Sequence, residues 1–382
     1  MLLAAALAMA CRGGEPRGPC QPEPPPGALG SVCGFENPED VAWVPTARLL
    51  MVSQMRHEGD ATGGSLAALT LGPAGEPIAA PRRLWPPSDA AREALAPSGH
   101  STCTAPPEAA RFSPHGLAAG APGPEGEIPV AVVGHGVREA VELFALRGAG
   151  QAATLRWQGC VPLPENATGN DVWLAEDGAL WVTNYQPALG GLRGLFHTIV
   201  GGLGLPTGEV LRWRSSRWES IPGTRGANPN GLVLMPGGET LAVAFTAAGR
   251  VGLRPLAPEA GSPRDIEIGG HPDNLTLSSR ATLLALVHTS GLASLRCRLG
   301  ARPCTSPGKL VEIDPATGVA SERFSHDGSL IGGLASVAEV GDRLYFGAVY
   351  DDRIGVLSKA AEPPRSEPEA SEVHQGRPSG VH

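Results

Sequence analysis

The sequence predicts an all-β protein folded as a six-bladed β-propeller, and two observations lead to this prediction. The first is a phrase of two short apolar strands joined by a turn, clearest at 170–185, where Asp177-Gly178 is typical of a β-hairpin. The second is that looser copies of this phrase recur, so that six copies begin near residues 40, 116, 171, 231, 274 and 335. Repeats of this length with several short strands each are typical of propeller blades, whereas a β-sandwich does not repeat one phrase.

Segments between the copies supply the outer strands that each blade needs. These segments predict strands at 65–71, 141–147, 209–214, 250–256 and 309–318. The longer first interval is explained by a Pro/Ala-rich surface insertion around 80–110.

A second insertion, 188–206, is apolar and rich in glycine. We interpret it as the wall of a pocket that could also touch a membrane surface, and a glycine-rich loop packed on the propeller is the alternative.

Composition and the chain ends set the domain organisation. The 382 residues carry a net charge of −8 without any basic stripe, which excludes nucleic acid as a partner. Residues 1–10 are apolar and lead into Cys11, as in a signal peptide of a lipoprotein, so we expect export to the periplasm or outside the cell, with a lipid anchor at Cys11. A buried first strand is the alternative. We expect a flexible tether at 11–32, the propeller at 33–358 and a disordered tail at 359–382.

Six cysteines remain when Cys11 is set aside, and an even number in an exported protein indicates disulfides. Six cysteines allow fifteen connectivities. Proximity in sequence favours Cys20–Cys33 and Cys297–Cys304, which leaves Cys103 with Cys160.

Polar residues open the first strand of most copies, and in a propeller these strands line the central channel. The set consists almost entirely of carboxylates and amides: Glu39, Asp40, His115, Asn170, Asp171, Asn230, Asp273 and Asn274. Oxygen donors of this kind suit a hard cation, calcium before magnesium, although Asn and Asp also cap turns in many proteins. The predicted fold class is therefore a six-bladed β-propeller with a central calcium site.

Over residues 35–357 the chain resembles the paraoxonase/arylesterase family of calcium-dependent lactonases, which is related to gluconolactonase and strictosidine-synthase-like propellers. The resemblance is carried in collinear order by NPEDVAWV (37–44), FSPHGL (112–117), VAVVGHG (130–136), GNDVWLAEDGALWVTN (169–184), NPNGLVLMPGGETLAVA (228–244), HPDNLTL (271–277) and GSLIGGLASVAEVGDRLYFGAV (328–349).

The resemblance implies two calcium ions. The catalytic ion would be held by Glu39, Asn170, Asn230, Asp273 and Asn274. The structural ion would be held by Asp40, Asp171 and the backbone carbonyl of Leu117.

The resemblance also implies roles for histidines. His115 would be the general base, His135 its proton-relay partner and His288 a third histidine of the substrate pocket. Tyr185, also in the pocket, stands where the family has an acid that orients the second histidine, so the sequence leaves the orientation of His135 unexplained.

These residues predict a calcium-dependent hydrolase that opens lactones or cleaves aryl esters. The metal would polarise the carbonyl and a histidine would activate water. No G-x-S-x-G motif for a serine esterase occurs. Two alternatives stay open: a non-catalytic, calcium-stabilised binding module, and a sugar lactonase of the gluconolactonase type.

Overall fold

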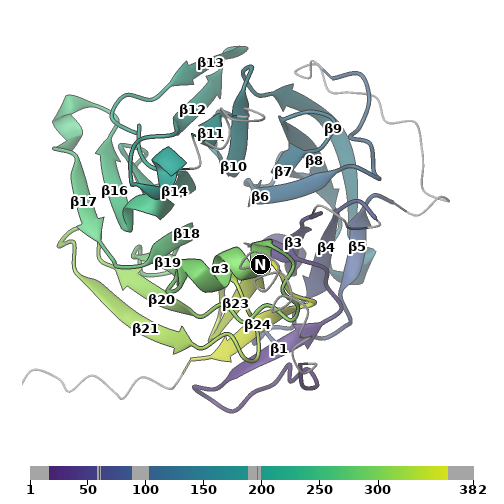
Figure 1. Cartoon of the computed structure of the whole chain (residues 1–382). Helices are drawn as coiled ribbons and strands as arrows, with labels where there is room; N and C mark the ends of the chain where they lie inside the picture. Colours follow the sequence, from purple (N-terminus) through teal and green to yellow (C-terminus); the bar gives the residue numbers. More distant parts are fainter. Residues whose placement is uncertain are drawn as a thin grey trace, which may run out of the picture.

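A computed structural model describes residues 17–57, 60, 62–87, 103–187, 196 and 199–359. They form six four-stranded antiparallel sheets arranged in a ring (Figure 1). The predicted six-bladed β-propeller is thus confirmed. The predicted signal segment, Cys11, nearly all of the tail and most of the 188–206 insertion lie outside the described residues.

The strands follow one another outward through each blade. Blade 1 contains β2 (Pro38–Val44), β3 (Leu49–Gln54), β4 (Ser65–Thr70) and β5 (Arg82–Trp85). Blade 2 contains β6 (Ser113–Ala119), β7 (Ile128–His135), β8 (Ala140–Arg147) and β9 (Thr154–Pro162). Blade 3 contains β10 (Ala167–Leu174), β11 (Leu180–Pro187), β12 (Glu209–Arg214) and β13 (Arg217–Ser220).

The second half of the ring repeats this order. Blade 4 contains β14 (Pro229–Leu234), β15 (Thr240–Phe245), β16 (Arg250–Pro255) and β17 (Arg264–Glu267). Blade 5 contains β18 (His271–Leu277), β19 (Leu283–His288), β20 (Gly308–Ile313) and β21 (Ala320–His326). Blade 6 contains β22 (Leu334–Val340), β23 (Arg343–Ala348), β24 (Arg353–Ser358) and β1 (Leu29–Cys33).

The six repeated phrases are the first two strands of the six blades, and the first strand of each lies innermost (Figure 1). The five predicted outer strands are the third strands β4, β8, β12, β16 and β20. These segments stand out in the sequence as apolar runs because strands such as β4, β8 and β20 are buried along most of their length.

The ring is closed by a strand that the sequence analysis placed in a tether. β1 pairs antiparallel with β24, with Leu29 opposite Leu357 and Cys33 opposite Arg353. The predicted boundary of the tether at residue 32 is therefore wrong. Because β1 supplies the fourth strand of blade 6, the two ends of the propeller are held in one sheet by backbone hydrogen bonds.

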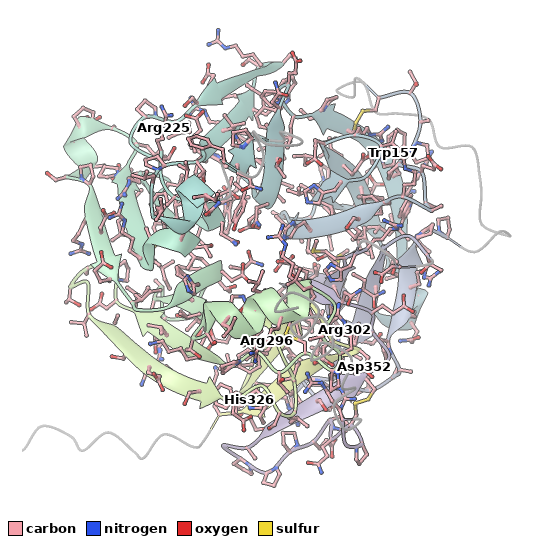
Figure 2. The ribbon with its side chains drawn as sticks, viewed as in Figure 1. Trp157, Arg225, Arg296, Arg302, His326 and Asp352 are labelled. Carbon is pink, nitrogen blue, oxygen red and sulfur yellow. A yellow bond between two sulfur atoms is a disulfide. The ribbon has the colours of Figure 1, made fainter. Side chains whose placement is uncertain are left out.

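Large apolar side chains fill the spaces between blades. Between blades 1 and 2, Met51, Trp85, Phe112, Phe144 and Trp157 belong to one buried cluster, and Trp157 is marked in Figure 2. This packing fixes the inner strands relative to one another, which is what allows residues far apart in sequence to share one site.

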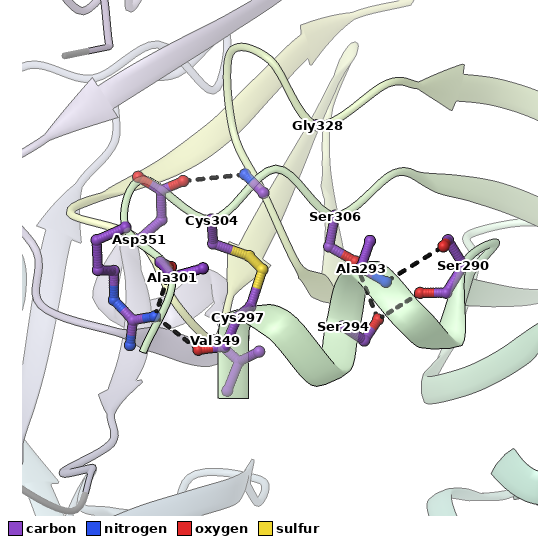
Figure 3. Close-up of a disulfide and its surroundings, with 12 residues drawn as sticks. Ser290, Ala293, Ser294, Cys297, Ala301, Cys304, Ser306, Gly328, Val349 and Asp351 are labelled. Carbon is purple, nitrogen blue, oxygen red and sulfur yellow. Dashed lines mark hydrogen bonds between the residues drawn. A yellow bond between two sulfur atoms is a disulfide. The ribbon is translucent and has the colours of Figure 1, made fainter. Parts of the chain in front are cut away.

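A short helix that the sequence analysis did not predict, α3 (Gly291–Arg298), follows β19. Ser290 caps it by accepting a hydrogen bond from the N–H of Ala293, and the Cys297–Cys304 disulfide ties its last turn to the next loop (Figure 3). Four short 3₁₀ turns are also described: η1 (Pro45–Ala47), η3 (Gly150–Ala152), η4 (Thr246–Ala248) and η5 (Pro258–Ala260). No helix within the described ranges is long and apolar enough to cross a membrane.

The three disulfides are those favoured by the sequence. Cys20–Cys33, Cys103–Cys160 and Cys297–Cys304 have Cα–Cα separations of 5.8, 5.5 and 5.1 Å. The first secures β1, which closes the ring, and the second joins the segment before β6 to β9 of the same blade.

Candidate metal centre and histidine pair

Every inner strand has a β-bulge at the same level, and the predicted ligands lie at these bulges. In blade 3, for example, Gly169 pairs with Asn184 and Val172 with Val182, so Asn170 and Asp171 together face one residue of the neighbouring strand. Equivalent register shifts occur in the other five blades. A bulge releases side chains from the regular alternation and turns them in a new direction, here toward the channel.

Local hydrogen bonds keep the bulges in shape. The N–H of Asp40 donates to the hydroxyl of Ser53 at 3.0 Å, and the N–H of Asp171 donates to that of Thr183 at 2.9 Å. These hydroxyls replace the ladder partners that the bulge removes.

Two glycines at the bulges are required by close contact between blades. A Cβ on Gly116 would lie 2.6 Å from Cα of Asp171, and a Cβ on Gly231 would lie 2.6 Å from Cα of Asn274. The His-Gly and Asn-Gly pairs seen in the sequence therefore let adjacent inner strands approach closely enough to share ligands.

The five residues predicted to hold the catalytic ion are all buried. Four of them have a buried side-chain oxygen with no hydrogen-bond partner among the described residues: Glu39 Oε2, Asn170 Oδ1, Asn230 Oδ1 and Asn274 Oδ1. The fifth, Asp273, accepts a hydrogen bond from His288.

Hydrogen bonds connect several members of this set. Nδ2 of Asn274 donates to Oε1 of Glu39 at 3.0 Å, so strands β2 and β18 meet although they lie far apart in sequence. Nδ2 of Asn170 lies 3.4 Å from Nε2 of His115, and Oε1 of Glu39 lies 3.5 Å from the same nitrogen. The amide nitrogens of Asn170 and Asn274 are used in these contacts, whereas their amide oxygens have no hydrogen-bond partner among the described residues.

A bound cation would lower the electrostatic cost of burying this set of residues. Burial raises the pKa of Glu39 well above its ordinary value, and the nearby carboxylate of Asp273 raises it further. A buried anion beside unpartnered oxygens is costly unless a cation or a proton is present. The residues therefore fit a hard cation that prefers oxygen ligands, such as Ca²⁺.

Among the described residues, no group of three or more His, Cys, Asp and Glu side chains is placed to hold a metal ion by itself. This finding agrees with the composition of the set, in which three of five members are asparagines. Such a set does not resemble the nitrogen and sulfur sites preferred by zinc.

The residues predicted for the structural ion form a second layer beside the first. Asp40 Oδ2 accepts a hydrogen bond from the N–H of Leu117 at 2.8 Å, and Asp171 Oδ2 accepts one from the N–H of Leu232 at 2.8 Å. Each aspartate also accepts from the next residue of its own strand, Val41 or Val172. Asp40, Leu117 and Asp171 line a cavity of about 510 Å³.

The two aspartates influence each other electrostatically. Burial is the largest cause that raises the pKa of each aspartate. The next cause is repulsion by Glu39 in the case of Asp40, and repulsion by Asp40 in the case of Asp171. The structure shows Leu117 bonded to Asp40 through its N–H, whereas the sequence analysis assigned its carbonyl as a ligand.

The two predicted catalytic histidines are in contact. Nδ1 of His115 lies 3.0 Å from Nε2 of His135. Burial lowers the pKa of His115, which favours its neutral form.

An acid that sequence reasoning missed completes this arrangement. Oε2 of Glu139 lies 2.8 Å from Nδ1 of His135, four residues away across the turn between β7 and β8. The resemblance predicts an acid at position 185, where Tyr185 stands, and Glu139 belongs to no repeated phrase. The only signal was its distance of four residues from His135, which is not distinctive in a strand protein.

His288 and Tyr185 lie elsewhere in the site. Nε2 of His288 is 2.8 Å from Oδ2 of Asp273, so this histidine orients a predicted ligand. Its Nδ1 is buried without a hydrogen-bond partner among the described residues. Burial, and after it the charge of Asp273, raises the pKa of Tyr185 to about 12.

Comparison with known proteins gives a likeness of fold. No protein-family model and no curated protein matches the sequence. A gluconolactonase from Xanthomonas campestris is similar in structure, with 16% identity, a TM-score of 0.53 and coverage of 90% of this chain and 98% of that chain. A candidate gluconolactonase from a structural genomics consortium shows 16% identity, a TM-score of 0.50 and coverage of 88% and 93%.

A calcium-binding protein, regucalcin from Agrobacterium tumefaciens, shows 13% identity, a TM-score of 0.49 and coverage of 88% and 97%. The two neighbours with a TM-score of at least 0.50 are thus a gluconolactonase and a candidate gluconolactonase. Identities this low show a shared fold only.

Proposed function

We propose that the protein is a calcium-dependent hydrolase that opens lactones. The single observation that supports this most strongly is the group of buried, unpartnered oxygens on Glu39, Asn170, Asn230 and Asn274, with a neutral histidine in contact with two of these residues. A metal site beside a base is what hydrolysis of an ester or lactone requires.

The proposed metal ligands are Glu39, Asn170, Asn230, Asp273 and Asn274 for the catalytic ion and Asp40, Asp171 and Leu117 for the structural ion. When bound, Ca²⁺ would polarise the substrate carbonyl and stabilise negative charge on its oxygen.

The protein's own groups would handle the proton. His115 would take a proton from water at Nε2, while the hydroxyl oxygen bonds to the carbonyl carbon. The imidazolium formed would be stabilised by its Nδ1–H bond to Nε2 of His135. The ring C–O bond would then break, and the leaving oxygen would recover the proton. Because burial lowers the pKa of His115, the base is neutral and ready to accept a proton at neutral pH.

Two substrate classes remain to be separated. The fold likeness to a gluconolactonase favours a sugar lactone. The resemblance to the paraoxonase/arylesterase family favours lipophilic lactones and aryl esters. We propose the broader lactone hydrolase, with the sugar lactone as the first substrate to test.

The experiment is a hydrolysis assay on a panel of gluconolactone, aliphatic γ- and δ-lactones and phenyl acetate. We expect turnover of at least one lactone, loss of turnover after chelation with EDTA, and recovery when Ca²⁺ is added back. His115→Gln should abolish most turnover while calcium still raises the melting temperature. A purified, calcium-loaded protein that hydrolyses no member of the panel would contradict the proposal and favour a non-catalytic binding module.

We also propose, from the apolar residues 1–10 and Cys11, that the protein is exported and lipid-anchored. Release from membranes by a Cys11→Ala substitution would test this.

A further inference from the structure

The carboxylate of Glu139 lies at the end of a chain of three side chains that leads to the proposed metal centre. Its Oε2 is 2.8 Å from Nδ1 of His135, and Nε2 of His135 is 3.0 Å from Nδ1 of His115. The remaining nitrogen, Nε2 of His115, faces Nδ2 of Asn170 and Oε1 of Glu39. These contacts connect a loop of blade 2 with the bulges of blades 1 and 3.

The chemistry of these partners determines where the protons lie. An ionised carboxylate only accepts hydrogen bonds, so Nδ1 of His135 must carry the proton. A neutral imidazole has one donor and one acceptor nitrogen, so Nε2 of His135 accepts a proton from Nδ1 of His115. Nε2 of His115 is then left with a lone pair. The amide donor of Asn170 beside that nitrogen agrees with this assignment.

We propose that Glu139 is a positioning residue that holds His135 in its Nδ1–H tautomer and thereby leaves the Nε2 lone pair of His115 facing the metal centre. This inference rests on the proposed function, because it assigns the orientation of the same base. Glu139 touches neither substrate nor metal and acts only through His135.

The backbone around Glu139 is built to place this side chain. Gly136 has a φ of +128°, and a Cβ there would lie 2.2 Å from the carbonyl oxygen of Arg111, so the turn after β7 requires glycine. The carbonyl of Glu139 accepts a hydrogen bond from the N–H of Leu163, which anchors the end of the turn to the residue that follows β9. Position 139 is therefore fixed by backbone contacts that do not need its carboxylate.

A purely stabilising role for the carboxylate is the competing explanation. The neighbouring cation, Arg138, is already bonded to Glu142 at 2.8 Å and to the carbonyl of Ala105, and it forms no ion pair with Glu139 in the described structure. The Glu139 side chain is 31% exposed, and pairs of that kind contribute little to stability. The carboxylate is therefore available to orient His135.

The test compares Glu139→Ala with Glu127→Ala, because alanine removes the acceptor that glutamine would keep. Glu127 is a matched control because it lies in the same blade, its side chain is 29% exposed, and it pairs with Arg147 away from the histidines. We expect Glu139→Ala to lower kcat about 10- to 100-fold with KM changed less than about twofold, because loss of an orienting partner disturbs the base and not substrate binding. The control should keep the wild-type kcat, and both variants should keep the wild-type melting temperature in calcium.

A second readout reports the tautomer directly. ¹⁵N NMR of the histidine side chains should show His135 as the Nδ1–H form in the wild type and in Glu127→Ala, with that form lost in Glu139→Ala. The proposal is overturned if His135 is Nε2–H in the wild type, if Glu139→Ala keeps full kcat, or if kcat falls while the tautomer is unchanged. If the wild type opened no lactone at all, the proposed function would fail, and the tautomer comparison alone would still decide the role of Glu139.

Discussion

The two layers of polar residues in the channel are built from neighbouring residues yet differ in what their oxygens do. Glu39 and Asn170 belong to the upper layer, and the next residue of each strand, Asp40 or Asp171, belongs to the lower layer. In the upper layer, both residues keep an oxygen without a partner among the described residues. In the lower layer, both aspartates accept two backbone hydrogen bonds each.

This difference separates a binding role from a structural one. Oxygens already held by backbone N–H groups of two blades stabilise the ring whether or not an ion is near. Oxygens without partners stabilise nothing until a cation binds. We therefore expect substitutions in the lower layer to reduce mainly stability, and substitutions in the upper layer to reduce mainly activity and calcium binding.

The largest effect on stability should come from Asp171→Ala. If this substitution lowered activity without lowering the free energy of unfolding, the contrast between the two layers would be wrong. The substitution leaves the buried N–H groups of Val172 and Leu232 without acceptors, and each such loss costs about 1–3 kcal/mol. We expect the free energy of unfolding to fall by about 4 kcal/mol, measured by denaturant titration. Asp177→Ala, on the exposed hairpin turn of the same blade, is the control and should cost less than about 1 kcal/mol.

Glu39→Gln should produce the next largest effect, this time on activity. Removing the only glutamate of the upper layer should weaken calcium binding and lower kcat/KM about 100-fold, or about 2.7 kcal/mol. The matched control is Glu36→Gln, three residues earlier and exposed, which should keep wild-type activity.

The stability of the same variant in EDTA gives a pH-dependent check. Burial raises the pKa of Glu39 in the folded protein, so its charged form is penalised, and the penalty grows as pH rises from about 4.5 through the raised pKa. Glutamine carries no charge. Chelated Glu39→Gln should therefore be more stable than the chelated wild type at pH 7.5, and the difference should shrink as pH falls toward 4.5. A variant less stable than the wild type in EDTA would show that Glu39 belongs to the framework.

Gly116→Ala should have a smaller effect that reaches both layers. A Cβ would lie 2.6 Å from both Cα and Oδ1 of Asp171, so strands β6 and β10 must separate. Overpacking of this kind costs about 1–3 kcal/mol, and the shift should also weaken calcium binding, measured by calorimetry. Gly202→Ala, where a Cβ would meet nothing within 4 Å, should change neither quantity.

The sequence was sufficient to predict the inner and third strands because both recur at the same register in each blade. The ligand positions could be predicted for the same reason, since every copy has its bulge at the same place. Blade 6 has this bulge as well, and there the hydroxyl of Ser336 donates a hydrogen bond to the carbonyl of Glu39.

Features that depend on a single contact could not be predicted. β1 has no repeated phrase and becomes a strand only because β24, more than three hundred residues later, offers a free edge. Glu139 likewise carries no motif, and its function depends on a turn that returns the chain beside His135. In both cases the role of the residues is set by a tertiary contact and not by a pattern in their own segment.

The smallest effect should come from Tyr185→Phe, which tests whether the tyrosine hydroxyl has replaced the acid expected at this position. Burial raises the pKa of Tyr185 to about 12, so the hydroxyl stays protonated at neutral pH and cannot orient a histidine as an anion would. The acid that contacts His135 is Glu139. We therefore expect kcat to change less than about twofold, the effect of a substitution worth under about 0.5 kcal/mol. A tenfold loss in the same lactone assay would mean that blade 3 contributes to orienting the base, and the role assigned to blade 2 would have to be shared.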